Sequence, residues 1–190
     1  MLFIPPGREK LFLVGIDPGT TTLGVSVLSY DFNSGLKRLE MAYTLNAAKC
    51  LSEYSPIIET SGERYARLKS HSHYLGRLFE ELQPDEILTE VPYMGRFPQA
   101  FAGLVETLGM IENTVRQHNP FMQLQKIDPA TVKTHVNVSG KSKDKMDMHR
   151  AVCAIPDIDF SRVNPTGLDE HSIDAIAVAY ARLRLLTSRL

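Results

Sequence analysis

The chain of 190 residues has the length of one domain, and its 43% hydrophobic and 23% charged residues are typical of a globular protein that fills a core. It contains no run of about eighteen apolar residues, and its start, MLFIPPGREK, lacks the basic and apolar segments of a secretory signal, so we expect neither a membrane helix nor a signal peptide. The formal charge of −1 neither requires nor excludes a nucleic-acid partner, because such binding depends on local patches.

The two cysteines give no sign of a disulfide or a metal site. Cys50 and Cys153 stand far apart in apolar surroundings, without the CxxC or Cys/His spacing of zinc ligands. We interpret both as buried thiols. A reducing cytoplasm suits them, either that of a bacterial cell or, if the source is viral, that of the host.

The N-terminal part of the chain predicts three strands in succession, followed by a helix. Residues 11–17 form an apolar run that ends in turn residues, 22–30 are rich in β-branched and apolar residues, and 36–45 can add a third strand. Between 60 and 82 the apolar positions recur at helical spacing with charged residues between them. This pattern predicts an amphipathic helix.

The rest of the chain alternates between the two kinds of element. We predict a buried strand at 86–90, a helix at 98–117, a strand at 122–127, helices at 129–136 and 142–154, and a final helix at 169–186. A three-strand meander followed by alternating helices and strands predicts an α/β fold, a mixed β-sheet flanked by helices. No repeat, low-complexity tract or linker interrupts the pattern, so we expect a single domain over 1–190.

Two acidic residues stand at the carboxyl ends of predicted strands. Asp17 ends the first strand and begins the turn Asp-Pro-Gly-Thr-Thr, and Glu90 ends the segment Glu-Ile-Leu-Thr-Glu. A carboxylate at such a place is costly to bury unless a cation or hydrogen-bond donors compensate its charge. Each also has an ordinary interpretation, Asp17 as the cap of a turn and Glu90 as a surface residue at the end of a strand.

The beginning of the final helix supplies a third signal. His171 and Asp174 are three residues apart, so both side chains lie on one face of a helix that is otherwise almost entirely apolar. Capping of the first turn suits Asp169 but not Asp174, which lies more than a turn inside. A metal shared with Asp17 and Glu90 would give the pair a partner. Three carboxylates and an imidazole predict a site for two Mg²⁺ ions, with Mn²⁺ as a substitute, that bridge a scissile phosphate.

In the same order along the chain, these motifs resemble those of the RuvC family of Holliday-junction resolvases. The matching segments are GIDPGTT at 15–21, TEVPY at 89–93, the basic stretch that contains Lys133 and Lys141, and HSIDAIAVAYA at 171–181. The resemblance spans about residues 11–182. Four ordered motifs are far more specific than the Asp-x-Gly-Thr turn alone, which also opens the actin-like ATPases.

The resemblance implies a fold, an activity and a site. The fold is RNase H-like, and the activity is that of a metal-dependent endodeoxyribonuclease that resolves four-way DNA junctions by paired symmetric nicks. The family's four site positions fall on the residues already singled out as catalytic groups and metal ligands, which are Asp17, Glu90, His171 and Asp174. Some members carry histidine and others aspartate in the third position, so His171 is a tolerated departure that makes metal affinity more dependent on pH.

The resemblance also implies partners. The family acts as a homodimer, whose interface would involve the helix at 98–117, although the surplus apolar residues of this helix could equally belong to the core. A branch-migration helicase is a further possible partner. Tyr93 takes the place of an aromatic residue that enters the junction and stacks on bases, and Arg96 could reinforce the same surface. The ordinary interpretation of Tyr93 is a hydrophobic plug in the loop after Pro92.

The densest basic stretch of the chain lies between 126 and 150. It holds six Lys or Arg residues against three Asp: Lys126, Lys133, Lys141, Lys143, Lys145 and Arg150. The loop 139–143 leads into a helix N-terminus, where free backbone amides add to lysine in attracting phosphate. We therefore predict DNA contacts by Lys133, Lys141, Lys143 and Lys145, with a solvated charged face as the ordinary interpretation.

Other functions remain open on the sequence alone. An actin-like nucleotide-binding protein would use the Asp-Pro-Gly-Thr turn to hold phosphate, but it needs two lobes, for which this chain is too short. A non-catalytic junction-binding protein would keep the basic stretch and lose the acids. An RNase H-like nuclease that acts on RNA or on other branched DNA would share the metal chemistry, because substrate shape is scarcely encoded in the sequence.

Overall fold

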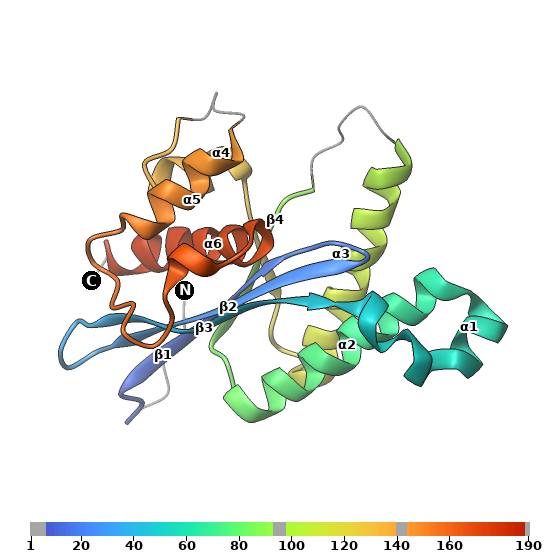
Figure 1. Ribbon diagram of the computed structural model, residues 1–190. Helices are drawn as coiled ribbons and strands as arrows, with labels where there is room; N and C mark the ends of the chain where they lie inside the picture. The colour runs from blue at the N-terminus through green and yellow to red at the C-terminus, as the bar shows by residue number, and fades with distance from the viewer. Residues whose placement is uncertain (1–6, 93–97, 140–143, 189–190) are drawn as a thin grey trace.

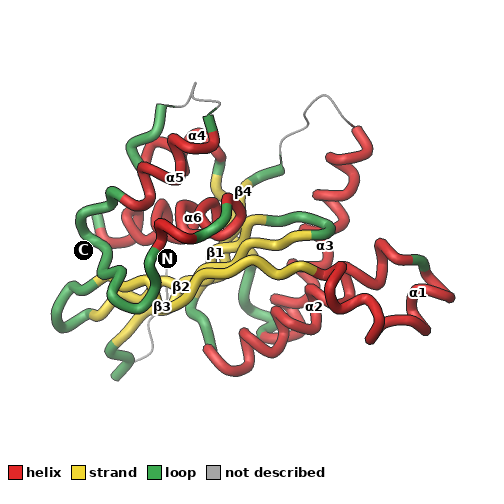
Figure 2. The backbone as a smooth tube through the Cα atoms, in the orientation of Figure 1, coloured by secondary structure: helices red, strands yellow, loops and turns green. Residues whose placement is uncertain are grey.

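The computed structural model describes residues 7–92, 98–139 and 144–188. Five strands form one mixed sheet in the order β3-β2-β1-β4-β5 (Figures 1 and 2). The strands are β1 (Lys10–Asp17), β2 (Thr22–Asp31), β3 (Lys37–Asn46), β4 (Glu86–Glu90) and β5 (Leu124–Ile127). The predicted α/β fold with a mixed sheet is confirmed.

The sheet combines a meander with a parallel half. β1, β2 and β3 pair antiparallel through short turns, whereas β4 runs parallel to β1 and β5 runs parallel to β4. Ile16 pairs with Thr89, so Asp17 and Glu90 each follow one residue later at the same edge of the sheet. The carboxyl ends of three parallel strands thus meet there, which is where open α/β sheets commonly build their sites.

Helices cover both faces of this sheet (Figure 1). They are η1 (Ala47–Tyr54), α1 (Ser55–Ser61), α2 (Glu63–Leu82), α3 (Pro98–His118), α4 (Pro129–His135), α5 (Lys145–Cys153), η2 (Pro165–Gly167) and α6 (Glu170–Thr187). α6 lies across one face with α4 and α5 against it, and α2 and α3 pack on the opposite face. None of these helices is both long and apolar enough to span a bilayer, within the residues described.

The alternation of side chains along β1 divides the core in two. Leu11 and Leu13 point into the layer shared with α6, whereas Val14 and Ile16 point into the layer shared with α2 and α3. α6 has the sheet on one side and α4 and α5 on the other, which explains why its sequence is apolar nearly all round. Most of this helix is buried, so a polar side chain within it needs a reason to be there.

The main differences between the predicted and the observed elements lie around Gly62 and at the start of β5. The predicted helix 60–82 is interrupted at Gly62, whose φ of 83° ends α1 and precedes α2. The helical turns before it, η1 and α1, were not predicted, because helices this short hold too few apolar positions to show a period. β5 begins only at Leu124, since Met122 lies in a turn and donates its N–H to the carbonyl of Asn119.

The cysteines are free thiols, as predicted. Cys50 and Cys153 are each only partly buried, however, so the expectation of fully buried thiols was wrong. Burial nevertheless raises the pKa of the Cys153 thiol.

Candidate functional site

The site begins with a close approach between α6 and the sheet. A Cβ atom on Gly24 would lie 2.1 Å from the carbonyl oxygen of His171, and one on Gly15 would lie 2.2 Å from that of Ala175. Only glycine therefore allows the backbone of α6 to touch β1 and β2. Ser26 fixes this contact by donating its hydroxyl to the carbonyl of Ala175 at 2.8 Å. The first turns of α6 are in this way held over the end of β1.

This approach brings His171 against Asp17. Nδ1 of His171 lies 2.7 Å from Oδ2 of Asp17, and Nε2 lies 3.0 Å from the hydroxyl of Thr22. The hydrogen bond with Asp17 and the charges of Asp17 and Glu170 raise the pKa of His171, against the opposing effect of burial. Both ring nitrogens are thus engaged, one by a predicted site residue and one by Thr22, which the sequence analysis missed.

Glu90 lies on the same face of the sheet, at the end of β4. Burial raises its pKa to about 7, and repulsion from Asp174 and Asp17 adds to the shift, while the Lys133 ammonium opposes it. The structure therefore brings Asp17, Glu90 and Asp174 close enough for their charges to interact. A fourth carboxylate, Asp128, also raises the pKa of Glu90.

Asp128 was not predicted as part of this region. It caps α4, where its carboxylate accepts hydrogen bonds from the amides of Ala130 and Thr131 at 2.9 and 3.2 Å. The signal was present in the sequence, because a capping aspartate directly after β5 must lie at the carboxyl edge of the sheet beside Glu90. Thr22 carries no comparable signal, since only the contact with α6 makes its hydroxyl relevant.

The four side chains are chemically suited to bind a divalent cation, although they do not already surround a single point. Three carboxylates and an imidazole are suitable ligands for Mg²⁺ or Mn²⁺, and a cation would relieve the repulsion that raises the pKa of Glu90. Within the residues that the structure describes, no three His, Cys, Asp or Glu side chains are already arranged around one point. His171 would have to give up a hydrogen bond to become a ligand.

The predicted DNA contacts are only partly visible. Lys133 projects from α4 close enough to Glu90 to lower its pKa. Lys126 and Arg150, also in the basic stretch, form ion pairs with Glu112 and Asp147 at 2.5 and 3.2 Å. Lys145 begins α5, but its side chain lies outside the described residues, as do Tyr93, Arg96, Lys141 and Lys143 entirely.

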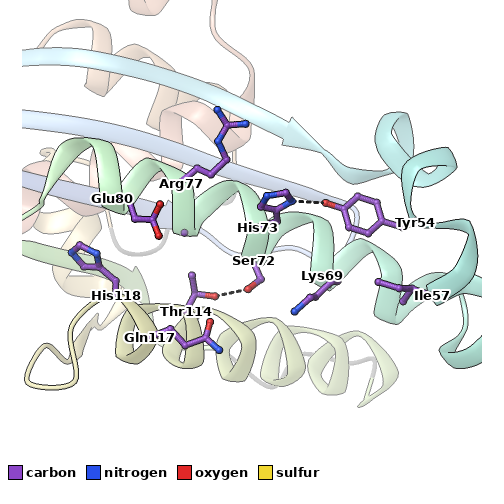
Figure 3. A pocket seen from close by; sticks show the side chains of 11 residues that line it. Tyr54, Ile57, Lys69, Ser72, His73, Arg77, Glu80, Thr114, Gln117 and His118 are labelled. Atoms are coloured by element: carbon purple, nitrogen blue, oxygen red, sulfur yellow. Dashed lines mark hydrogen bonds between the residues drawn. The ribbon is translucent and has the colours of Figure 1, made fainter.

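A groove elsewhere on the molecule is not part of this site. It has a volume of about 440 Å³ and lies where α2, α3 and the η1–α1 segment meet (Figure 3). Ser72 and Thr114 share a hydrogen bond of 2.8 Å between the two long helices, and Tyr54 closes one end with a contact to His73. None of the lining residues is a candidate site residue, so this groove is separate from the candidate site.

Comparison with known proteins gives different results for sequence and structure. No family model and no curated protein sequence matches the chain. Among solved structures, RuvC of Thermus thermophilus in complex with a Holliday junction substrate is similar, with a TM-score of 0.67 and 17% identity over 94% of this chain and 96% of that chain.

One eukaryotic structure and one viral structure are also similar. The yeast mitochondrial Holliday junction resolvase Ydc2 has a TM-score of 0.59 and 15% identity, over 98% of this chain and 84% of that one. The fowlpox virus resolvase, solved with Holliday junction DNA, has a TM-score of 0.56 and 14% identity, over 95% and 99%. The chain thus has the fold of the RuvC-type resolvases over nearly its full length, and the RNase H-like fold implied by its motifs is confirmed.

Proposed function

We propose that the protein is a structure-specific endonuclease that resolves four-way DNA junctions by paired symmetric nicks. The observation that carries this proposal is the meeting of Asp17, Glu90 and Asp174 with His171 at one edge of the sheet. The similar fold of three junction resolvases supports it, two of which were solved with junction DNA. The gathering of acids argues against a non-catalytic junction-binding protein, which would have no need of several carboxylates close together.

The four side chains would act together as metal ligands. Asp17, Glu90, Asp174 and His171 would hold two Mg²⁺ or Mn²⁺ ions, which when bound would activate the attacking water and stabilise the leaving oxygen. The raised pKa of Glu90 means that this carboxyl gives up a proton when a cation binds near neutral pH. Thr22 would hold the imidazole of His171 in place until then.

The surroundings of the site would bind the DNA. Lys133, whose charge acts on Glu90, would contact a backbone phosphate near the carboxylates. We further propose that Lys141, Lys143 and Lys145 bind backbone phosphates, and that Tyr93 and Arg96 contact the junction centre. Paired nicks require two sites, so the active form would be a homodimer. A branch-migration helicase would be a further partner.

The test is to incubate the purified protein with a mobile four-way junction and with linear duplex of the same sequence, with Mg²⁺ or with EDTA, and to map the nicks. We expect Mg²⁺-dependent, symmetric nicks confined to the junction. Asp17→Asn should bind the junction and leave it uncut. Binding without cleavage by the unaltered protein would instead indicate a non-catalytic junction-binding protein. Cleavage only of flaps or of RNA would indicate another RNase H-like nuclease.

A further inference from the structure

The first turn of α6, which carries His171, is bonded to two strands of the sheet. From β2, the hydroxyl of Thr22 lies 3.0 Å from Nε2 of His171. From β3, the hydroxyl of Thr44 donates to Oδ1 of Asp169 at 2.5 Å. Asp169 is the N-cap of α6, and the same oxygen accepts the amide of Ser172 at 2.9 Å. His171 stands between these two residues, so the bond from Thr44 constrains the turn that carries the imidazole.

Thr44 also bonds to Ser172 directly. The two hydroxyl oxygens are 2.9 Å apart, and Ser172 is only 2% exposed. An ionised carboxylate can only accept hydrogen bonds, so the single hydroxyl proton of Thr44 goes to Asp169, and the Ser172 hydroxyl donates to Thr44. Thr44, Asp169 and Ser172 therefore form a closed set of three hydrogen bonds between β3 and the first turn of α6.

The pairing of the strands places Thr44 in one row with Asp17. Asp17 pairs with Gly24 across β1 and β2, and Gly24 pairs with Thr44 across β2 and β3. Residues paired in this way point to the same face of a sheet, here the face that α6 covers. Asp17 bonds to the ring of His171, and Gly24 touches its backbone carbonyl. Thr44, at the other end of the row, bonds to the residues before and after His171 and so fixes the turn relative to Asp17.

The hydrogen bonds of Thr44 are not needed to cap the helix. Asp169 already caps α6 by accepting the amide of Ser172, which is the bond that stabilises a helix N-terminus. A valine at position 44 would have almost the shape of threonine and would suit a strand equally well. The hydroxyl of Thr44 therefore adds a tie from the cap to the sheet, and this tie fixes the position of the turn.

We propose that Thr44 is a positioning residue of the site: by holding Asp169 and Ser172 it fixes the turn that carries His171, and so sets how the imidazole meets Asp17. This proposal rests on the nuclease function proposed above. Thr44 is not one of the proposed ligands or DNA contacts, and it acts only through the turn. Loss of its hydroxyl should change the rate of cleavage more than the affinity for DNA.

The test compares Thr44→Val with Thr114→Val, which removes a hydroxyl that ties α2 to α3 far from the site. At saturating junction, Thr44→Val should lower kcat by about five-fold or more, with junction binding in EDTA within about two-fold of the unaltered protein. Thr114→Val should destabilise the fold but keep the kcat of the folded fraction. Thr44→Ala, which also lacks the hydroxyl, gives the same comparison if the valine variant does not fold.

The conservative variant separates the hydrogen bonds from packing. Thr44→Ser keeps the hydroxyl and loses only the methyl group, so its kcat should stay within about two-fold of that of the unaltered protein. A kcat of Thr44→Val within about two-fold of the unaltered protein, or an equal loss in Thr44→Ser, would overturn the proposal.

A readout without DNA or metal keeps the two proposals apart. The ¹⁵N signals of the His171 ring, identified by their absence in His171→Gln, report the bonds of both ring nitrogens to Asp17 and Thr22. At one fixed pH these signals should move in Thr44→Val and stay in place in Thr44→Ser and Thr114→Val. If the unaltered protein cuts no junction, the proposed function fails, and the spectra still decide the role of Thr44. Unmoved signals in Thr44→Val would refute that role.

Discussion

Glu86 and Glu90 stand at the two ends of β4, on the same face, and both point toward α6. At the first end, Arg182 of α6 donates two hydrogen bonds of 2.6 Å to Glu86. At the other end, α6 presents Asp174, whose charge helps to raise the pKa of Glu90 to about 7 after burial. One helix thus neutralises one glutamate and repels the other.

The difference separates an end of the strand whose charge is compensated by an ion pair from the end at which we propose that cations bind. Glu86 is largely buried, and its ion pair with Arg182 compensates its charge without any further group. A buried carboxyl beside other carboxylates destabilises the fold unless a cation or a proton arrives. The protein could have compensated Glu90 as it compensates Glu86, and instead it gathers further acids there, which is the arrangement expected of a cation site.

The largest expected effect follows from replacing each glutamate in turn and comparing activity. Glu90→Gln should lower junction cleavage by more than about 100-fold, because replacing even a residue that only hydrogen-bonds to a metal ligand lowers activity by about 10- to 100-fold. Glu86→Gln should leave the activity per folded molecule unchanged. Single-turnover cleavage, normalised to the folded fraction by circular dichroism, checks both. Near-normal nicking by Glu90→Gln would mean that the metal-site assignment is wrong.

For stability, the order of the two residues is reversed: replacing Glu86 should have the larger effect. Glu86→Gln should lower the free energy of unfolding by about 3 kcal/mol, the low end for a broken buried ion pair, since Arg182 keeps 26% of its side chain exposed. Glu90→Gln should cost nothing or stabilise the metal-free protein, because it removes a repelled charge. Urea unfolding in EDTA measures both. The double variant Glu86→Gln/Arg182→Met is the control, and it should recover most of the loss.

The same contrast explains which parts of the site could be predicted from the sequence. The strand ends and the His171–Asp174 spacing predicted which acids would meet, because the carboxyl ends of parallel strands share an edge and residues three apart share a helix face. The sequence does not reveal that His171 bonds to both Asp17 and Thr22. That contact depends on the glycines that let α6 touch the sheet, and a glycine within a strand predicts close approach without naming the partner.

The ion pair of Glu86 with Arg182 was not predicted, for a related reason. In the sequence it is simply the first residue of a strand, and its partner Arg182 lies 96 residues away on α6. Charge pairs of such separation follow from the packing of a helix across a sheet and not from any local pattern. The segment η1–α1 escaped prediction for the opposite reason, since its helices are too short for a hydrophobic period.

A third prediction concerns the contribution of Glu90 to the pH dependence of stability. Its pKa rises from the ordinary 4.5 to about 7 on folding, so the fold favours the protonated carboxyl. This contribution to stability is complete below pH 4.5 and is lost as the pH rises through 7. We expect the metal-free protein to lose roughly 2 kcal/mol relative to Glu90→Gln over this range, less than the full shift would give because Glu90 keeps some contact with solvent.

The measurement is urea unfolding in EDTA at a series of pH values for both proteins, taken as a difference so that other titrating groups cancel. Adding Mg²⁺ at pH 8 should restore the lost stability in the unaltered protein and have less effect in Glu90→Gln. A difference that stays constant from pH 4.5 to 8 would show that Glu90 is compensated like Glu86.

The smallest expected effect concerns the lysine that opposes the repulsion at Glu90. The Lys133 charge lowers the pKa of Glu90, so Lys133→Gln should raise that pKa further, by less than about one unit because charges partly exposed to water interact weakly. A ¹³C titration of the Glu90 carboxyl in the metal-free protein measures the midpoint directly. Lys126→Gln is the matched control, since Lys126 pairs with Glu112 and should leave the midpoint unchanged. An equal shift of the Glu90 pKa in both variants would mean that this pKa depends on the overall surface charge and not on Lys133 itself. The difference between Glu90 and the paired Glu86 would then be due to burial and the neighbouring acids alone.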